Sequence, residues 1–144
     1  MEETTAVADR AAALVEPARA AGRRVLLVIT GPPAAGKSSI AAAVAAAVPG
    51  AVVVPMDGFH LTTAELQRRG WVEERGTPRT FDAEGYVALL RRVRAGDSVR
   101  APAFDRCVEE PVPDAIVVPR SAPLVITEGN YLLLDVAPWC TIRA

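Results

Sequence analysis

Eight consecutive residues near the N-terminus, Gly31-Pro32-Pro33-Ala34-Ala35-Gly36-Lys37-Ser38, have the types and spacing of a phosphate-binding loop. Its glycines let backbone N–H groups approach an anion closely, and the helix that follows points its positive end at the same anion. In such loops the lysine reaches the β- and γ-phosphates, and the following hydroxyl is a ligand of Mg²⁺. We therefore predict a nucleotide-phosphate site in which Lys37 contacts phosphate and Ser38 contacts Mg²⁺. A turn that binds nothing would not explain the lysine.

Two carboxylates each follow an apolar run that is typical of a buried strand. Asp57 comes directly after residues 51–56, and Glu128 comes directly after residues 124–127. Ligands of open α/β sheets bind at the carboxyl ends of strands, so both side chains are candidates for a reaction with the bound phosphate. Asp57 is the candidate base, whereas Glu128 would hold Mg²⁺ through water or bind the substrate. The alternative for each is a local turn, with Gly58 or with Gly129.

A third candidate is the tripeptide Phe104-Asp105-Arg106, an aromatic residue followed by an acid and a base. It could line an acceptor pocket, although a solvated Asp–Arg pair is an equally good interpretation. His60 is the only histidine in the chain, and we expect it to form a pocket wall rather than to act as the base. The arginines at 91, 92 and 94 are expected on the solvated face of a helix, and Arg79 is a candidate phosphate contact.

These side chains must be positioned by alternating helices and strands. We predict a helix over 4–21 that Pro17 breaks or kinks, strands over 25–29, 51–56 and 124–127, and a helix over 37–48. A short helix over 61–69 and a helix that starts near Ala83, capped by Asp82, would follow the second strand. Residues 99–104 and 116–118 are expected to be extended, and 131–134 to form a short strand or the start of a helix. The pattern predicts a three-layer α/β/α fold with a mostly parallel sheet.

Composition narrows the class of protein. The 144 residues carry 16 basic and 17 acidic side chains, which argues against a nucleic-acid partner held by bulk charge. No apolar stretch is long enough to span a bilayer, and the N-terminus does not resemble a signal peptide. Two cysteines and one histidine make neither a disulfide framework nor a zinc site. We expect a cytoplasmic protein with no membrane and no nucleic-acid partner, and with an oligomeric state that the sequence leaves open.

The phosphate-binding loop alone does not distinguish among the classes of nucleotide-binding protein. No guanine-binding motif of the NKxD type and no DxxG after an apolar strand is present, which argues against a GTPase. The acidic pair that a motor ATPase needs is also missing. A kinase needs a base near the acceptor hydroxyl, and the position of Asp57 provides one.

Several motifs in order resemble the P-loop kinases grouped with uridine kinase, phosphoribulokinase and bacterial pantothenate kinase. They are GPPAAGKSS, MDGFHL, GTPRTFDAEGYVALL, APAFDR, LVITEGNYLLLD and PW. The resemblance implies a P-loop NTPase fold and ATP-dependent phosphorylation, with Mg²⁺, of a hydroxyl on a small molecule. It also implies a role for each matching residue. Gly31 to Ser39 would hold the ATP phosphates and Mg²⁺, and Asp57 would be the base, with Phe59 and His60 beside the acceptor. The residues at the acceptor site would be Phe104, Asp105 and Arg106, and Glu128 would lie near the metal and the acceptor.

The resemblance also sets an expectation about extent. Members of this group normally continue past the region of Trp139 with an arginine-bearing lid and a further strand, whereas this chain ends at Ala144. We therefore expect an N-terminal helical segment over 1–22 and a P-loop kinase domain over 23–144 that is incomplete at its C-terminal end. The alternatives are a catalytically inactive nucleotide-binding fragment or regulatory protein and, less favoured, a P-loop hydrolase. A nucleoside, a sugar and a pantothenate-like alcohol all remain open as the acceptor.

Overall fold

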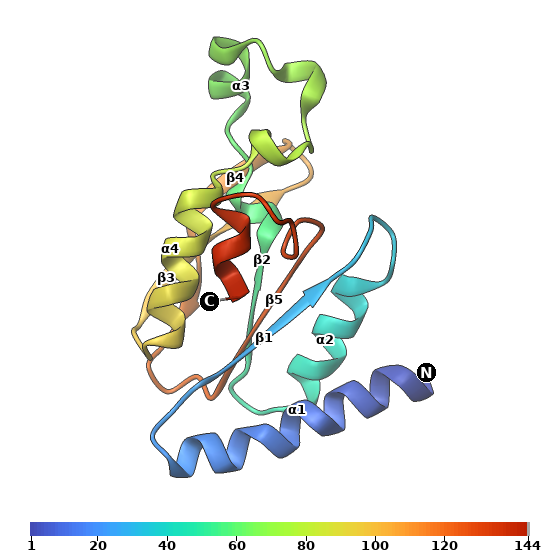
Figure 1. The fold of residues 1–144 in the computed structure, drawn as a ribbon, viewed down its shortest axis with the longest axis vertical. Coiled ribbons are helices and arrows are strands. Elements are labelled where there is room, and N and C mark those ends of the chain that lie inside the picture. Colours follow the sequence, from blue (N-terminus) through green and yellow to red (C-terminus); the bar gives the residue numbers. More distant parts are fainter. Residues whose placement is uncertain (144) are drawn as a thin grey trace.

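The computed structural model describes residues 1–143 (Figure 1). Its helices are α1 (Glu2–Ala20), α2 (Lys37–Ala47), α3 (Thr63–Arg69) and α4 (Ala83–Arg94). Its strands are β1 (Val25–Thr30), β2 (Val52–Pro55), β3 (Val99–Asp105), β4 (Glu110–Val118) and β5 (Leu124–Gly129). Short 3₁₀ turns, η1 (Met56–Phe59), η2 (Val72–Glu74), η3 (Pro78–Thr80) and η4 (Trp139–Arg143), complete the regular structure. No helix in the described part is both long and apolar enough to cross a membrane.

The central sheet has three parallel strands in the order β1-β5-β2. The last strand in sequence therefore lies between the first two, and all six of its residues are buried. Val25 to Thr30 of β1 pair with Leu124 to Gly129, and Val52 to Pro55 of β2 pair with Val125 to Glu128. As a result, the carboxyl ends of all three strands meet at one edge of the sheet.

Alternate residues of the strands face opposite layers, as the period of two along a strand requires. On one face, Leu124 and Ile126 pack with Ala41 and Val44 of α2 and with Val15 of α1. On the other face, a second cluster joins strand residues to α4, the β3–β4 hairpin and the C-terminal turn, and includes Val54, Val125, Tyr86, Leu90, Val118 and Trp139. The three-layer α/β/α arrangement expected from the sequence is confirmed (Figure 1).

Local sequence explains where most elements begin and end. The Asp82 side chain accepts a hydrogen bond from the Gly85 N–H, which is the expected N-cap of α4. Gly36 has φ +82°, a left-handed conformation that glycine adopts without strain, at the junction between the loop and α2. Helix α1 continues through Pro17 to Ala20, so the expected break does not occur there. Its residues Ala8, Ala11 and Val15 are buried in the same cluster as the sheet.

Two expectations were wrong or incomplete. Residues 131–134 form turns rather than a strand or the start of a helix. The extended pieces at 99–104 and 116–118 are parts of one antiparallel hairpin, β3–β4, and β4 starts earlier, at Glu110. Sequence periodicity missed this strand because Pro111 and Pro113 interrupt its pattern and because most of its residues are exposed.

Candidate functional site

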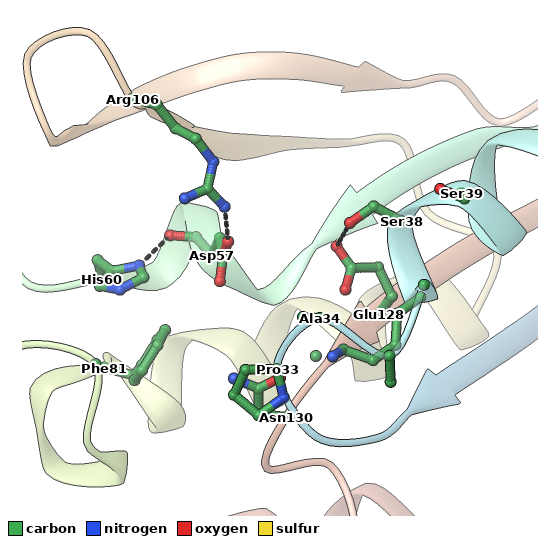
Figure 2. Close-up of a pocket in the computed structure, with 15 residues that line it drawn as sticks. Pro33, Ala34, Ser38, Ser39, Asp57, His60, Phe81, Arg106, Glu128 and Asn130 are labelled. Carbon is green, nitrogen blue, oxygen red and sulfur yellow. Dashed lines mark hydrogen bonds and ion pairs between the residues drawn. The ribbon is translucent and has the colours of Figure 1, made fainter.

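A pocket of about 530 Å³ opens where the carboxyl ends of the three parallel strands converge. One part of its lining comes from the loop after β1, residues 33–39. The rest comes from Asp57, His60, Gly76, Phe81, Arg106, Glu128, Gly129 and Asn130. The topology thus brings the predicted phosphate loop and the predicted carboxylates to one cavity (Figure 2).

The loop between β1 and α2 has the shape of an anion nest. Ala34 and Gly36 both have positive φ, +60° and +82°, so the backbone curls around a central space. Lys37 is only 9% exposed, and its Nζ donates a hydrogen bond of 2.7 Å to the Pro32 carbonyl. The ammonium group is therefore held inside the loop.

Ser38 and Glu128 meet at the floor of the pocket. The Ser38 hydroxyl donates to Glu128 Oε1 over 3.2 Å (Figure 2). Burial raises the pKa of Glu128, and the hydrogen bond from Ser38 partly opposes that rise. A hydroxyl oxygen next to a carboxylate suits Mg²⁺, which prefers oxygen ligands and keeps several waters. The residues fit the metal, and Ser38 with Glu128 would hold it. Within residues 1–143, no group of three or more acidic, His or Cys side chains forms a protein-only metal cage.

Asp57 lies in the turn η1, which follows β2 directly. Its Oδ2 accepts a hydrogen bond of 2.6 Å from the Arg106 guanidinium, and the two charges form an ion pair. Arg106 lies just beyond the end of β3, so the hairpin reaches over the pocket to meet Asp57 (Figure 2). The close approach depends on Gly58, because a Cβ there would lie 2.1 Å from the Pro102 carbonyl oxygen.

Three tilted rings contact one another beside the pocket. The His60 ring lies between Phe81, at a centroid distance of 4.2 Å, and Phe104, at 4.5 Å. His60 Nδ1 lies 2.6 Å from the Asp57 carbonyl oxygen, which can only accept, so Nδ1 carries the proton. His60 and Phe81 line the pocket, whereas Phe104 is not among the lining residues.

Not every predicted side chain lines the pocket. Phe59 is 6% exposed and packs against Tyr86 in the core, because η1 turns its ring toward α4. Asp105 accepts a hydrogen bond from the Cys107 N–H at the hairpin turn, which directs its carboxylate to a local role. Phe59, Phe104 and Asp105 are therefore not among the lining residues, and their expected acceptor contacts stay a prediction. Gly31 and Pro32 also lie outside the lining, although the Pro32 carbonyl holds Lys37.

The arginines outside the Phe104-Asp105-Arg106 tripeptide that the sequence analysis singled out lie at the surface. Arg79 is exposed, pairs with Glu74 and stacks 4.4 Å from the centroid of the Trp71 ring, away from the pocket lining. The three arginines of α4 at 91, 92 and 94 are exposed, as expected for a solvated helix face.

Sequence reasoning missed four lining residues, Gly76, Phe81, Gly129 and Asn130. Phe81 had an available signal, since it precedes the N-cap Asp82 and therefore lies where α4 begins. Gly76 had no such signal, because it lies in an irregular segment. The Tyr131 hydroxyl donates a hydrogen bond to the Gly76 carbonyl.

A buried hydrogen-bond chain supports the pocket from below. The Tyr86 hydroxyl donates to Thr127 Oγ1 at 2.5 Å, and Thr127 Oγ1 donates to the Val54 carbonyl at 2.7 Å. Thr127 immediately precedes Glu128, and Val54 belongs to the strand that leads to Asp57. Burial raises the pKa of Tyr86, so its hydroxyl stays protonated as a donor.

Comparisons with known proteins point to one group. The chain is 37% identical over 98 residues to an ATP-dependent kinase-like protein of Aspergillus versicolor, covering 62% of this chain and 57% of that protein. It is 40% identical over 93 residues to a candidate uridine kinase of Schizosaccharomyces pombe, covering 60% of this chain and 40% of that protein. Pantothenate kinases also match. No protein-family profile matches the chain.

Solved structures agree with the sequence matches. The crystal structure of a candidate fructose transport system kinase from Silicibacter sp. TM1040 superposes with a TM-score of 0.78 at 38% identity, over 84% of this chain and 61% of that one. In sequence and in fold, this chain is similar to P-loop kinases of the uridine kinase and pantothenate kinase group. The chain spans about 40% to 60% of the length of the first relatives above.

Proposed function

We propose that this chain acts in ATP-dependent transfer of the γ-phosphate to a hydroxyl group of a small molecule. The observation that carries the proposal is that the Lys37–Ser38 loop and Asp57 line the same pocket. A phosphate held by the loop and a hydroxyl held by Asp57 would therefore face one another across one cavity. The similarity to an ATP-dependent kinase-like protein and to a candidate uridine kinase supports the same reaction class.

In the proposed reaction, the loop amides and Lys37 hold the terminal phosphates and offset the charge that develops during transfer. Asp57 Oδ1 accepts the hydrogen bond of the acceptor hydroxyl and orients it toward phosphorus. The acceptor oxygen forms a bond to the γ-phosphorus, the bond from phosphorus to the β–γ bridging oxygen breaks, and ADP leaves. The hydroxyl proton goes to Asp57. Mg²⁺, when held by Ser38 and Glu128, supplies further charge compensation on the phosphates.

Two substitutions separate binding from transfer. Lys37→Ala should weaken ATP binding by about 100-fold or more, because the loop loses its only ammonium group. Asp57→Asn should keep ATP affinity within about threefold while transfer falls by at least about 100-fold. Calorimetry with ATP and Mg²⁺ measures binding, and labelled ATP with a panel of alcohols measures transfer. Arg91→Ala and Asp9→Asn, on exposed helix faces, are the matched controls.

A second candidate function is nucleotide binding without transfer. The chain spans 40% of the length of the candidate uridine kinase, so transfer by the chain itself has to be measured. ATP binding that depends on Lys37, with no transfer to any alcohol in the panel, would support this candidate and contradict the first. The cytoplasmic location and the division into residues 1–22 and 23–144 stay predictions.

A further inference from the structure

Two residues that line the pocket are held from behind by one side chain. Gly76 and Phe81 both line the cavity, whereas Tyr131 does not. The Tyr131 hydroxyl donates a hydrogen bond of 2.5 Å to the Gly76 carbonyl. The rings of Tyr131 and Phe81 meet in an edge-to-face arrangement, with their centroids 5.8 Å apart. One half-buried side chain therefore contacts both lining residues from outside the cavity.

Tyr131 is itself attached to the floor of the pocket. It directly follows residues 128–130, all three of which line the cavity. A Cβ on Gly129 would lie 2.6 Å from the Cβ of Met56, so the end of β5 is in direct contact with the start of η1. The buried Trp139 ring lies against the Tyr131 ring at a centroid distance of 5.9 Å. The Tyr131 side chain is therefore fixed at its base and along its ring.

One hydrogen bond joins the segment before α4 to the end of β5. Among residues 1–143, the bond from Tyr131 is the only hydrogen bond between residues 70–80 and residues 128–134. The N–H of Gly76 donates to Thr80 Oγ1 within its own segment. The carbonyl of Gly76 is therefore the point at which the segment is tied to the floor of the pocket.

Phe81 and His60 form one unit at the base of that segment. Their backbones pair as an antiparallel bridge, and their ring centroids lie 4.2 Å apart. Figure 2 shows both rings at the end of the pocket away from Ser38. We call Gly76, Phe81 and His60 the acceptor wall, because in the proposed function they lie beside the acceptor. A shift of Phe81 would move His60 as well.

We propose that Tyr131 is a positioning residue that fixes the acceptor wall relative to the floor of the pocket. This inference rests on the proposed function, because the wall affects transfer only where an acceptor binds beside it. Without the hydroxyl, the Gly76 carbonyl loses its partner and the wall can move. None of the hydrogen bonds described for residues 31–39 involves Tyr131. The acceptor should therefore bind more weakly while ATP binds as before.

Tyr131→Phe tests the inference on the full chain, because it removes the hydroxyl and keeps the ring. Transfer from labelled ATP is measured with glucose, uridine and pantothenate, one compound from each acceptor class that the sequence leaves open. For a compound that the parent chain phosphorylates, we expect the KM of the acceptor to rise at least about fivefold. The kcat and the Kd of ATP should stay within about twofold. A role in stability alone would lower kcat through a smaller folded fraction and leave the KM unchanged.

Tyr86→Phe is the matched control, because it removes a tyrosine hydroxyl that bonds to Thr127 and not to the acceptor wall. It should not raise the KM of the acceptor more than that of ATP. Hydrogen exchange is a second readout that needs no acceptor. In Tyr131→Phe, the amides of residues 76–82 should exchange at least about fivefold faster than in the parent chain, whereas those of residues 37–47 should not change.

A KM of the acceptor that is unchanged in Tyr131→Phe, or raised equally in both tyrosine variants, would overturn the inference. Unchanged exchange at residues 76–82 would overturn it too. A parent chain that transfers phosphate to none of the three compounds contradicts the proposed function instead. In that case the exchange rates alone decide whether Tyr131 holds the wall.

Discussion

At one end of the pocket the functional groups come from an uninterrupted loop, residues 33–39, whereas at the other end they come from separate segments around 57–60, 76–81, 106 and 128–130. In the proposed function, the first end binds phosphate largely through backbone N–H groups and one lysine, and we call it the phosphate end. The second, the acceptor end, would act through side chains that the hairpin, η1 and β5 bring together. A loop of this kind requires one strand and one helix, whereas the acceptor end requires most of the fold.

The two ends of the pocket also differ in how closely their backbones pack. At the phosphate end the glycines leave space, and a Cβ on Gly31 would lie 3.6 Å from the nearest atom. At the acceptor end the backbones are in direct contact, and a Cβ on Gly58 would overlap the Pro102 carbonyl. The phosphate end should therefore tolerate changes in the structure around it better than the acceptor end.

The largest expected effect comes from Gly58→Ala. The added Cβ would meet backbone atoms at 2.1 and 2.6 Å, so η1 or the hairpin must shift. We expect the free energy of unfolding to fall by about 2–3 kcal/mol. Where the variant is folded, transfer should be lost while ATP affinity is retained. Urea denaturation and calorimetry measure the two effects.

Gly31→Ala is the matched control for stability, and should change the free energy of unfolding by less than about 1 kcal/mol. Equal losses of stability in the two glycine variants would contradict the difference between the two ends.

A smaller effect is expected for Tyr86→Phe, which removes the hydroxyl that donates to Thr127. Because Thr127 keeps its bond to the Val54 carbonyl, we expect a loss of about 1 kcal/mol in the free energy of unfolding. The hydrogen bonds from Tyr86 through Thr127 to Val54 support both Glu128 and the strand before Asp57, so ATP binding and transfer should weaken together and modestly. A large loss of transfer with unchanged stability would show instead that Tyr86 acts at the acceptor end alone.

The smallest effect concerns the pH dependence of Glu128, whose pKa burial raises above the ordinary value of 4.5. Well below pH 4.5 the carboxyl is protonated in both the folded and the unfolded chain. Between 4.5 and the raised pKa the unfolded chain ionises first, so stability is lost as the pH rises through this window. E128Q lacks this loss, and its advantage in free energy of unfolding should grow from pH 4 to pH 7.

Urea denaturation of the parent chain and of E128Q at several pH values measures the difference in their free energies of unfolding. The ionisation of the groups that the two chains share cancels in that difference. An advantage that is constant with pH, or that shrinks as the pH rises, would show that the folded state does not penalise the charged form of Glu128.

Much of the scaffold could be predicted because local patterns specify it. The strands at 25–29, 51–56 and 124–127, helix α2 and the cap at Asp82 were expected within a few residues of their observed bounds. The hairpin β3–β4 was not, because its exposed, proline-containing second strand lacks a clear period. Gly76 entered the site without prediction, since nothing local marks a residue that another segment brings to the cavity.

The amino-acid sequence by itself determined the phosphate loop, because glycine placement, the lysine and the following helix are all local properties of residues 31–47. It also placed Asp57 and Glu128 at the ends of strands. Only the tertiary structure decided that β5 lies between β1 and β2, and that Arg106 reaches Asp57 across a hairpin. The reason is physical: strand order and the meeting of distant side chains depend on burying both faces of the sheet together, and no single segment contains that information.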